Sequence, residues 1–169
     1  VIDPSHSEVS FSVRHLMVSK VRGTFGTFAG SLTIAEDLLQ SSVSATIDAA
    51  SINTRDENRD NHLRTNDFFD IENHPEWTFV STGIREGGKG FLVDGDLTIR
   101  GTTKAVTLDL EILGVNKDPW GNTKIGFEGS AKISRKEFGL VWNVALEAGG
   151  VLVSDKIKIQ LDVSAIKTA

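Results

Sequence analysis

The sequence predicts an all-β fold of about eight antiparallel strands, arranged either as a closed barrel or as a sandwich of two sheets. Apolar and polar residues alternate with a period of two along most of the 169-residue chain, as in strands that bury one face. Turn sequences that suit hairpins separate the alternating runs, and helical periodicity is scarce. We therefore expect strands in hairpin order within a single domain spanning residues 1–169.

Most of the expected strands are regular, with apolar residues on one parity and polar residues on the other. These runs cover residues 9–14, 43–47, 91–100, 106–112, 124–133 and 156–163. Two further runs are irregular. Residues 23–34 change parity, so Gly26 or Gly30 is predicted to mark a β-bulge. Residues 76–83 are apolar on both parities.

The connections between the runs carry their own signals. Residues 118–121 read DPWG, with proline second and glycine fourth, as a type I turn prefers. Residues 100–103 read RGTT and offer a glycine for positive φ between two long runs. Residues 13–23 interrupt the alternation, and we expect a short helical turn there, whose apolar side, including Met17, lines or plugs the barrel.

Residues 51–75 differ from the rest because charged and amide side chains crowd together there. Thr54 and Glu57 have capping-box spacing, so a helix is expected to begin at Arg55. That helix is expected to carry two ion pairs, Asp56–Arg59 and Asp60–Arg64. We interpret the segment as a polar helix that covers and braces the barrel.

Two metal sites are the alternatives for this segment. Its acidic residues depart from the calcium-binding EF-hand loop, which has glycine at the sixth position and a bidentate glutamate at the twelfth. The spacing of His62 and His74 matches no recognised set of transition-metal ligands. No metal and no cofactor is therefore predicted.

Composition excludes several classes of partner and activity. A net charge of −5 argues against nucleic acid, and no stretch approaches the roughly 20 apolar residues of a membrane-spanning helix. There is no cysteine, no nucleophile elbow, and no pair of titratable groups held at working distance. We predict that the protein is not an enzyme, the alternative being catalysis with His15 or His62 as base.

Apolar inner faces fit two functions at this point, a packed core without a ligand or a cavity for an apolar molecule. The pattern alone favours the packed core, because most half-buried strands cover nothing but core. Localisation is open between cytoplasm and export, because the chain begins at Val1 and a leader could have been removed. A homodimer is also left open.

Four segments of the chain resemble the sequences of a known protein family. They are DPSHSEVSFSVRHLMVSKVRGTF (3–25), SINTRDENRDNHLRTNDFFDIENHPEWTFVST (51–82), GDLTIRGTTKAVTL (95–108) and SRKEFGLVWN (134–143). In order, and over almost the whole chain, they resemble the YceI-like, polyisoprenoid-binding family. The resemblance implies an extended, eight-stranded antiparallel β-barrel of lipocalin-like shape with one or two short helices. It implies an apolar pore that carries or stores a polyisoprenoid lipid, such as a polyprenyl quinone or its precursor.

The alternative function is a packed structural or interaction module with no internal ligand. If there is a pore, we predict that its lining comes from inward-facing apolar residues: Phe11, Val13, Met17, Phe28, Leu32, Phe79, Leu97, Ile99, Phe127, Phe138 and Trp142. Arg135 is expected to stack on Trp142 in an aromatic plug at one end. A rim of Arg14, His15 and Arg22 is predicted to meet a polar or phosphorylated head group, the alternative being solvated surface charges.

Overall fold

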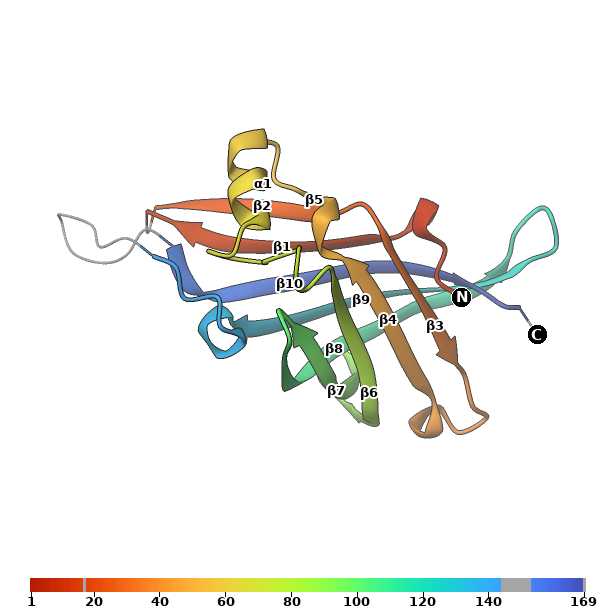
Figure 1. Ribbon diagram of the computed structural model, residues 1–169. Coiled ribbons are helices and arrows are strands. Elements are labelled where there is room, and N and C mark those ends of the chain that lie inside the picture. The colour runs from red at the N-terminus through yellow and green to blue at the C-terminus, as the bar shows by residue number, and fades with distance from the viewer. Residues whose placement is uncertain (17, 144–152, 169) are drawn as a thin grey trace.

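A ten-stranded antiparallel sheet curls around an apolar interior in this computed structural model, which describes residues 1–16, 18–143 and 153–168 (Figure 1). The strand order is β3-β4-β6-β7-β8-β9-β10-β1-β2-β5. The strands are β1 (Glu8–His15), β2 (Ser19–Phe25), β3 (Phe28–Thr33), β4 (Ser42–Asp48), β5 (Ile52–Asn53), β6 (Glu76–Gly87), β7 (Gly90–Ile99), β8 (Thr102–Lys117), β9 (Thr123–Ser134) and β10 (Val153–Ile166). The predicted all-β, antiparallel class is confirmed.

Short helices complete the described part of the chain. They are the α-helix α1 (Glu57–Arg64) and the 3₁₀ helices η1 (Pro4–His6), η2 (Leu38–Gln40), η3 (Ala49–Ser51) and η4 (Arg135–Phe138). Within the described ranges, no helix is both long and apolar enough to cross a bilayer.

The strand count is ten, and the prediction of eight was wrong because the run at residues 23–34 is divided between β2 and β3, and because β5 was not expected. β2 passes into β3 across Gly26 and Thr27, and β4 passes into β5 across η3. Backbone hydrogen bonds hold the two bends together, from Gly26 N to Ser51 O (3.2 Å) and from Asp48 N to Thr27 O (3.0 Å). The expected bulge is accordingly absent from this run, since Gly26 lies between strands and Gly30 pairs regularly with Ala45.

The first connection is a tight hairpin, and the expected helical turn at residues 13–23 was wrong. β1 and β2 stay paired as far as His15 and Ser19, which leaves only three residues to reverse the chain. Leu16 adopts a left-handed φ of 54°, and Val18 N donates to His15 O at 3.3 Å. Residues 13–15 and 19–23 therefore belong to paired strands, where a helical turn had been expected.

The predicted turns at residues 100–103 and 118–121 are confirmed. Arg100 and Gly101 take φ of 50° and 73° between β7 and β8, as a two-residue hairpin turn requires. Gly121 N donates to Asp118 O at 3.1 Å, which closes the other turn.

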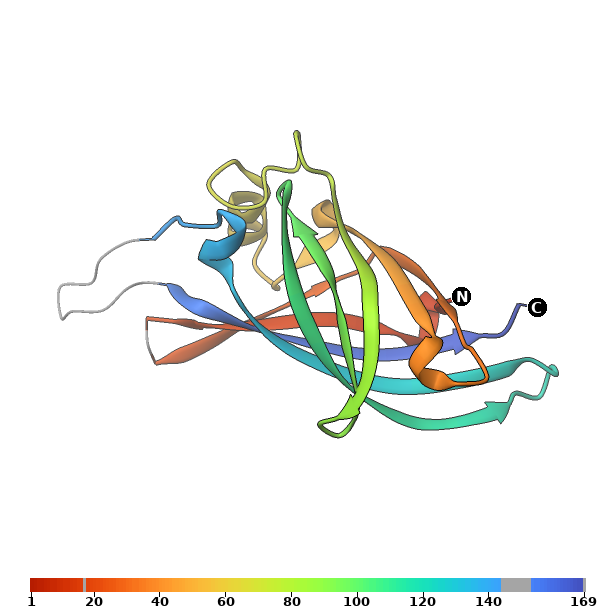
Figure 2. The ribbon, with the colours of Figure 1, turned by 90° about the horizontal axis from the view of Figure 1, so that it is seen from below.

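Strand β8 changes partner along its length. Its first half pairs with β7, from Thr102 to Leu110, and its second half pairs with β9, from Asp109 to Lys117. Meanwhile the last residues of β9 continue to pair with β10 on their other side. The first half of β8 is therefore not paired with the end of β9. Figure 2 shows how strongly the sheet is curled at this point.

Candidate functional site

The inner face of the sheet along β1 and β10 is apolar and partly exposed. Cross-strand pairs place Val13 opposite Ile157 and Phe11 opposite Ile159 on this face. Each of these side chains is only partly buried, although β1 and β10 both have hydrogen-bonded neighbours on either side. Alternate residues of a strand point to opposite faces of the sheet, so the exposure of these residues comes from the inner side. We call this face of β1 and β10 the inner wall.

The interior near α1 is packed instead. The rings of Phe25 and Phe69 each lie edge-on to Trp77, with centroids 4.8 Å away. Ile52 and Phe138 are almost wholly buried in the same cluster. The interior therefore has two zones, a dense aromatic end beneath α1 and an accessible wall along the central strands.

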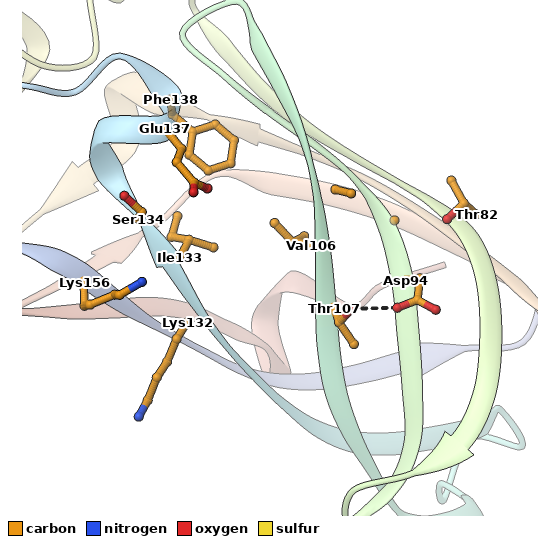
Figure 3. A pocket seen from close by; sticks show the side chains of 12 residues that line it. Thr82, Asp94, Val106, Thr107, Lys132, Ile133, Ser134, Glu137, Phe138 and Lys156 are labelled. Atoms are coloured by element: carbon orange, nitrogen blue, oxygen red, sulfur yellow. Dashed lines mark hydrogen bonds between the residues drawn. The ribbon is translucent and has the colours of Figure 1, made fainter.

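A crevice opens where β8 and β9 part, with a volume of about 430 Å³. Figure 3 shows Val106 of β8, Ile133 of β9 and Phe138 of η4 facing this gap. Lys132 and Lys156 line its outer part. The crevice thus joins an apolar floor to a polar mouth, as an amphiphilic molecule requires.

One carboxylate ties the strands together beside the crevice. Asp94 accepts hydrogen bonds from Arg85 Nε and Nη2 (3.0 and 3.1 Å) and from Thr107 Oγ1 (2.6 Å). The hydrogen bonds from Arg85, and then the one from Thr107, hold the pKa of Asp94 down to about 2. Because these residues belong to β6, β7 and β8, the cluster fixes one side of the opening.

The predicted pore residues fall into two groups. Phe11, Val13, Phe28 and Leu32 are partly exposed on β1 and β3. The buried group comprises Phe79, Leu97, Ile99, Phe127 and Phe138. Trp142 is partly buried and packs on the rings of His62 and Phe68, with centroids 4.9 and 5.3 Å away. Met17 lies outside the described residues.

The three predicted rim residues do not converge. Arg14 lies opposite Lys20, and Ser12 lies opposite Arg22, so both arginines project from the outer face of the β1–β2 hairpin. His15 has the opposite parity and belongs to the other face. Strand alternation therefore separates the cations that are close together in sequence.

The polar helix begins later than expected. Asp56 is its N-cap and accepts from Arg59 N at 3.0 Å, so the prediction of a Thr54 cap was wrong. Arg55 has a left-handed φ of 65°, which no residue in the first turn of a helix can have. Thr54 is buried beneath the helix and bonds to side chains of the helix instead.

The two expected ion pairs are also wrong, because Asp56 caps the helix and the other three side chains bond to the chain below it. Asp60 accepts from Thr54 N (2.9 Å) and from Thr54 Oγ1 (2.5 Å). Arg59 Nε donates to Thr54 Oγ1 at 2.8 Å, and its Nη2 donates to Thr54 O at 2.7 Å. Arg64 donates to the carbonyls of Ala50 and Ile52 at 3.0 and 3.1 Å. The segment thereby ties α1 to η3 and β5, in keeping with a bracing role.

The two histidines of this segment are placed apart. His62 Nε2 lies 2.8 Å from Asp67 Oδ2, whereas the ring of His74 packs against Gly101. In the part of the chain that the structure describes, no three His, Asp or Glu side chains are grouped as metal ligands would be.

Sequence reasoning missed the buried guanidinium of Arg135. It does not stack on Trp142 as expected, but donates to that residue's carbonyl at 2.9 Å. It also donates to the carbonyls of Leu140, Val153 and Ser154, at 2.6, 3.0 and 2.9 Å. Burial lowers the pKa of Arg135. Backbone acceptors leave no mark in a sequence, so no signal there could have found this arrangement.

The comparisons with known proteins agree with this architecture. A sequence model of the YceI-like domain matches residues 1–165. The chain belongs to the YceI-like family. A UPF0312 protein of Staphylococcus epidermidis is 43% identical over 160 residues, which cover 94% of this chain and 91% of that protein. The resemblance predicted from the four sequence segments is therefore confirmed.

Solved structures share the YceI-like fold. BcnA of Burkholderia cenocepacia matches with a TM-score of 0.83 at 26% identity, covering 98% of this chain and 99% of that one. A polyisoprenoid binding domain from Saccharophagus degradans, implicated in plant cell wall breakdown, matches with a TM-score of 0.75. That second match covers 99% of this chain and 97% of the other at 13% identity, so it bears on the fold alone.

Proposed function

We propose that this protein binds a polyisoprenoid lipid, with the apolar tail lying along the inner wall. The observation that carries the proposal is the partial exposure of inward-facing residues such as Phe11 and Ile159 on strands that are central in the sheet. Burying a tail against such a surface contributes about 0.8 kcal/mol per CH₂ before the entropic costs of binding. A domain of the same fold from Saccharophagus degradans is described as a polyisoprenoid binding domain, which makes this ligand class the one to test here.

We further propose a neutral ligand, such as a polyprenyl quinone or its precursor, that is carried or stored and not chemically changed. Among the described residues, the buried charged side chains are Asp60 and Arg135. Both are already bonded to neighbouring parts of the chain. A charged group drawn into the interior would meet no free counter-charge there, and burying it unpaired is costly.

The crevice between β8 and β9 is the opening that we assign to passage of the ligand. Its apolar floor meets the interior at Ile133 and Phe138. The chain has no cysteine, so Ala105→Cys can carry a bulky maleimide at the crevice. That label should slow lipid uptake, and the same label at Glu128→Cys, where β8 and β9 are still paired, should not. Equal uptake by both labelled proteins would exclude this route.

Native mass spectrometry of freshly purified protein, followed by organic extraction, tests the proposed function directly. We expect an adduct that is released by solvent and identified by mass as a neutral polyprenyl compound. A bare protein mass that stays unchanged after incubation with isoprenoid quinones would refute the proposal. The chain would then be a packed structural or interaction module.

A further inference from the structure

The indole N–H of Trp77 is buried without a hydrogen-bond partner among the described residues. Trp77 lies near the start of β6, and only 9% of it is exposed. A buried indole N–H normally finds an acceptor, because it has given up its bond to water. An exception inside an otherwise apolar interior calls for an explanation.

The surroundings of Trp77 connect it to the inner wall. Phe25 and Phe69 flank the indole edge-on, at interplanar angles of 62° and 79°. Phe25 in turn contacts Phe11, with ring centroids 5.9 Å apart. Phe11 is partly exposed on β1, so one ring separates Trp77 from the accessible surface.

A glycine makes room for the Phe11 ring. Gly23 lies directly opposite Phe11 on β2, and a Cβ at Gly23 would stand 2.6 Å from two atoms of the Phe11 ring. The Phe11 ring therefore occupies the space that a side chain at residue 23 would need. Of the aromatic cluster of Phe11, Phe25, Phe69 and Trp77, Phe11 is the member that is partly exposed, and it is where a ligand on the inner wall would meet the cluster.

We infer that the Trp77 indole N–H donates a hydrogen bond to an oxygen of the bound ligand, and so sets the position and chemical class of its head group. This inference rests on the proposed function. The matching ligand end is neutral, planar and oxygen-bearing, as in a quinone carbonyl or an aryl ether. A phosphate is disfavoured there, since the cluster supplies aromatic rings and one neutral donor but no cation. The head group then lies at the α1 end, and the tail extends along β1 and β10.

The test compares two probes, a geranylgeranyl-substituted naphthoquinone and squalene, which has isoprene chemistry but no oxygen. In ¹⁵N-labelled protein, the Trp77 indole resonance, assigned with Trp77→Phe, should move downfield with the quinone and stay nearly fixed with squalene. Trp77→Phe should weaken quinone binding by about three- to tenfold, the loss of one hydrogen bond, and change squalene binding by less than about twofold. Trp120→Phe is the matched control, because Trp120 is 83% exposed at the 118–121 turn.

The outcomes separate the two claims. If the quinone binds the wild-type protein but leaves the Trp77 resonance unmoved, the inference fails and the proposed function stands. Equal loss of both probes in Trp77→Phe would likewise overturn it, since the indole would then serve as packing only. If neither probe binds the wild-type protein, the proposed function fails and the inference fails with it. The resonance is read in the wild-type protein, and with three tryptophans in the chain it can also be assigned by elimination with Trp120→Phe and Trp142→Phe, so the test holds even if Trp77→Phe folds poorly.

Discussion

The segment of residues 51–75 and the inner wall of β1 and β10 differ in how their sequences relate to their roles. The segment contains much of the chemical variety of the chain, yet many of its polar groups bond to the segment itself or to the backbone beneath it. Asp60 bonds to Thr54, and Arg64 bonds to the carbonyls of Ala50 and Ile52. The inner wall is a monotonous alternation of Val, Ile, Leu and Phe, and it is the surface left open on the inside.

The difference teaches that a segment rich in polar residues can have a structural role, and that a uniformly apolar strand face can be a binding surface. A buried polar group is stable only if it is hydrogen-bonded, so a dense polar segment tends to use up its own donors and acceptors. An apolar face makes no such demand and can remain available to a ligand. The following predictions test whether the two regions divide stability and binding in this way.

Removing the carboxylate of Asp60 should have the largest effect, and it should act on stability. Asp60→Ala leaves the buried N–H and hydroxyl of Thr54 without their acceptor, and we expect a loss of about 3 kcal/mol in the free energy of unfolding. Urea denaturation measures this loss. Asp67→Ala, which breaks only the exposed contact with His62, should cost less than about 1 kcal/mol. Lost lipid binding with unchanged stability in Asp60→Ala would place this segment in the binding site.

A polar substitution on the inner wall should act on binding. Ile159→Gln places an amide on the inner face, and we expect lipid affinity to fall roughly tenfold because the amide must lose water without gaining a partner. Lys158→Gln introduces the same side chain one position away on the outer face and should leave affinity unchanged. Titration of an isoprenoid quinone against tryptophan fluorescence compares the two. Equal affinities would mean that the wall does not contact the ligand.

Adding one methyl group at Gly23 should perturb the wall at its aromatic end. Gly23→Ala pushes on the Phe11 ring and on Thr54 Cγ2, which lies 3.1 Å from the new Cβ position. Such overpacking is expected to lower stability by about 1 kcal/mol. Gly83→Ala meets nothing within 4 Å and should be neutral or slightly stabilising. Thermal unfolding of both variants checks the contrast, and a stabilised Gly23→Ala would show that Phe11 is free to move aside.

The smallest effect concerns acid sensitivity beside the crevice. The pKa of Asp94 is about 2 in the folded protein, below the value of about 3.9 for an unfolded chain. The ionised carboxylate therefore contributes stability above about pH 4, and this contribution is lost as pH falls towards 2. Asp94→Asn should show a shallower fall of melting temperature between pH 4 and 2 than the wild-type protein. Parallel curves would mean that Arg85 and Thr107 do not hold the carboxylate in solution.

Local chemistry explains why several features were predictable. Alternation along β1, β9 and β10 depends only on each strand's own side chains, so the strands and their inner faces follow from the sequence. The turn at residues 100–103 was equally local, because Arg100 and Gly101 carry its positive φ angles themselves. The family was predictable as well, since its motifs are continuous segments of the chain.

Features that depend on distant parts of the chain were not predictable in the same way. The bends at Gly26 and η3 raised the strand count to ten, because backbone bonds to residues more than 20 positions away hold them. Arg135 was expected to stack on Trp142, and its actual role was not predictable because its acceptors are carbonyls, which every residue has. The rim of Arg14, His15 and Arg22 did not form, because pairing with β2 set the arginines on the outer face.

The sequence by itself determined the all-β class, the apolar inner faces and the family, because side-chain alternation and continuous motifs are local properties. Only the tertiary structure decided that the first half of β8 pairs with β7 and the second half with β9, which leaves a crevice between the unpaired parts of β8 and β9. It also decided that Trp77 is buried with no acceptor among the described residues, while Asp60 is buried with two donors. The physical reason is that the curl of the sheet decides which strands stay paired and which polar atoms meet, and neither outcome is encoded in a neighbouring residue.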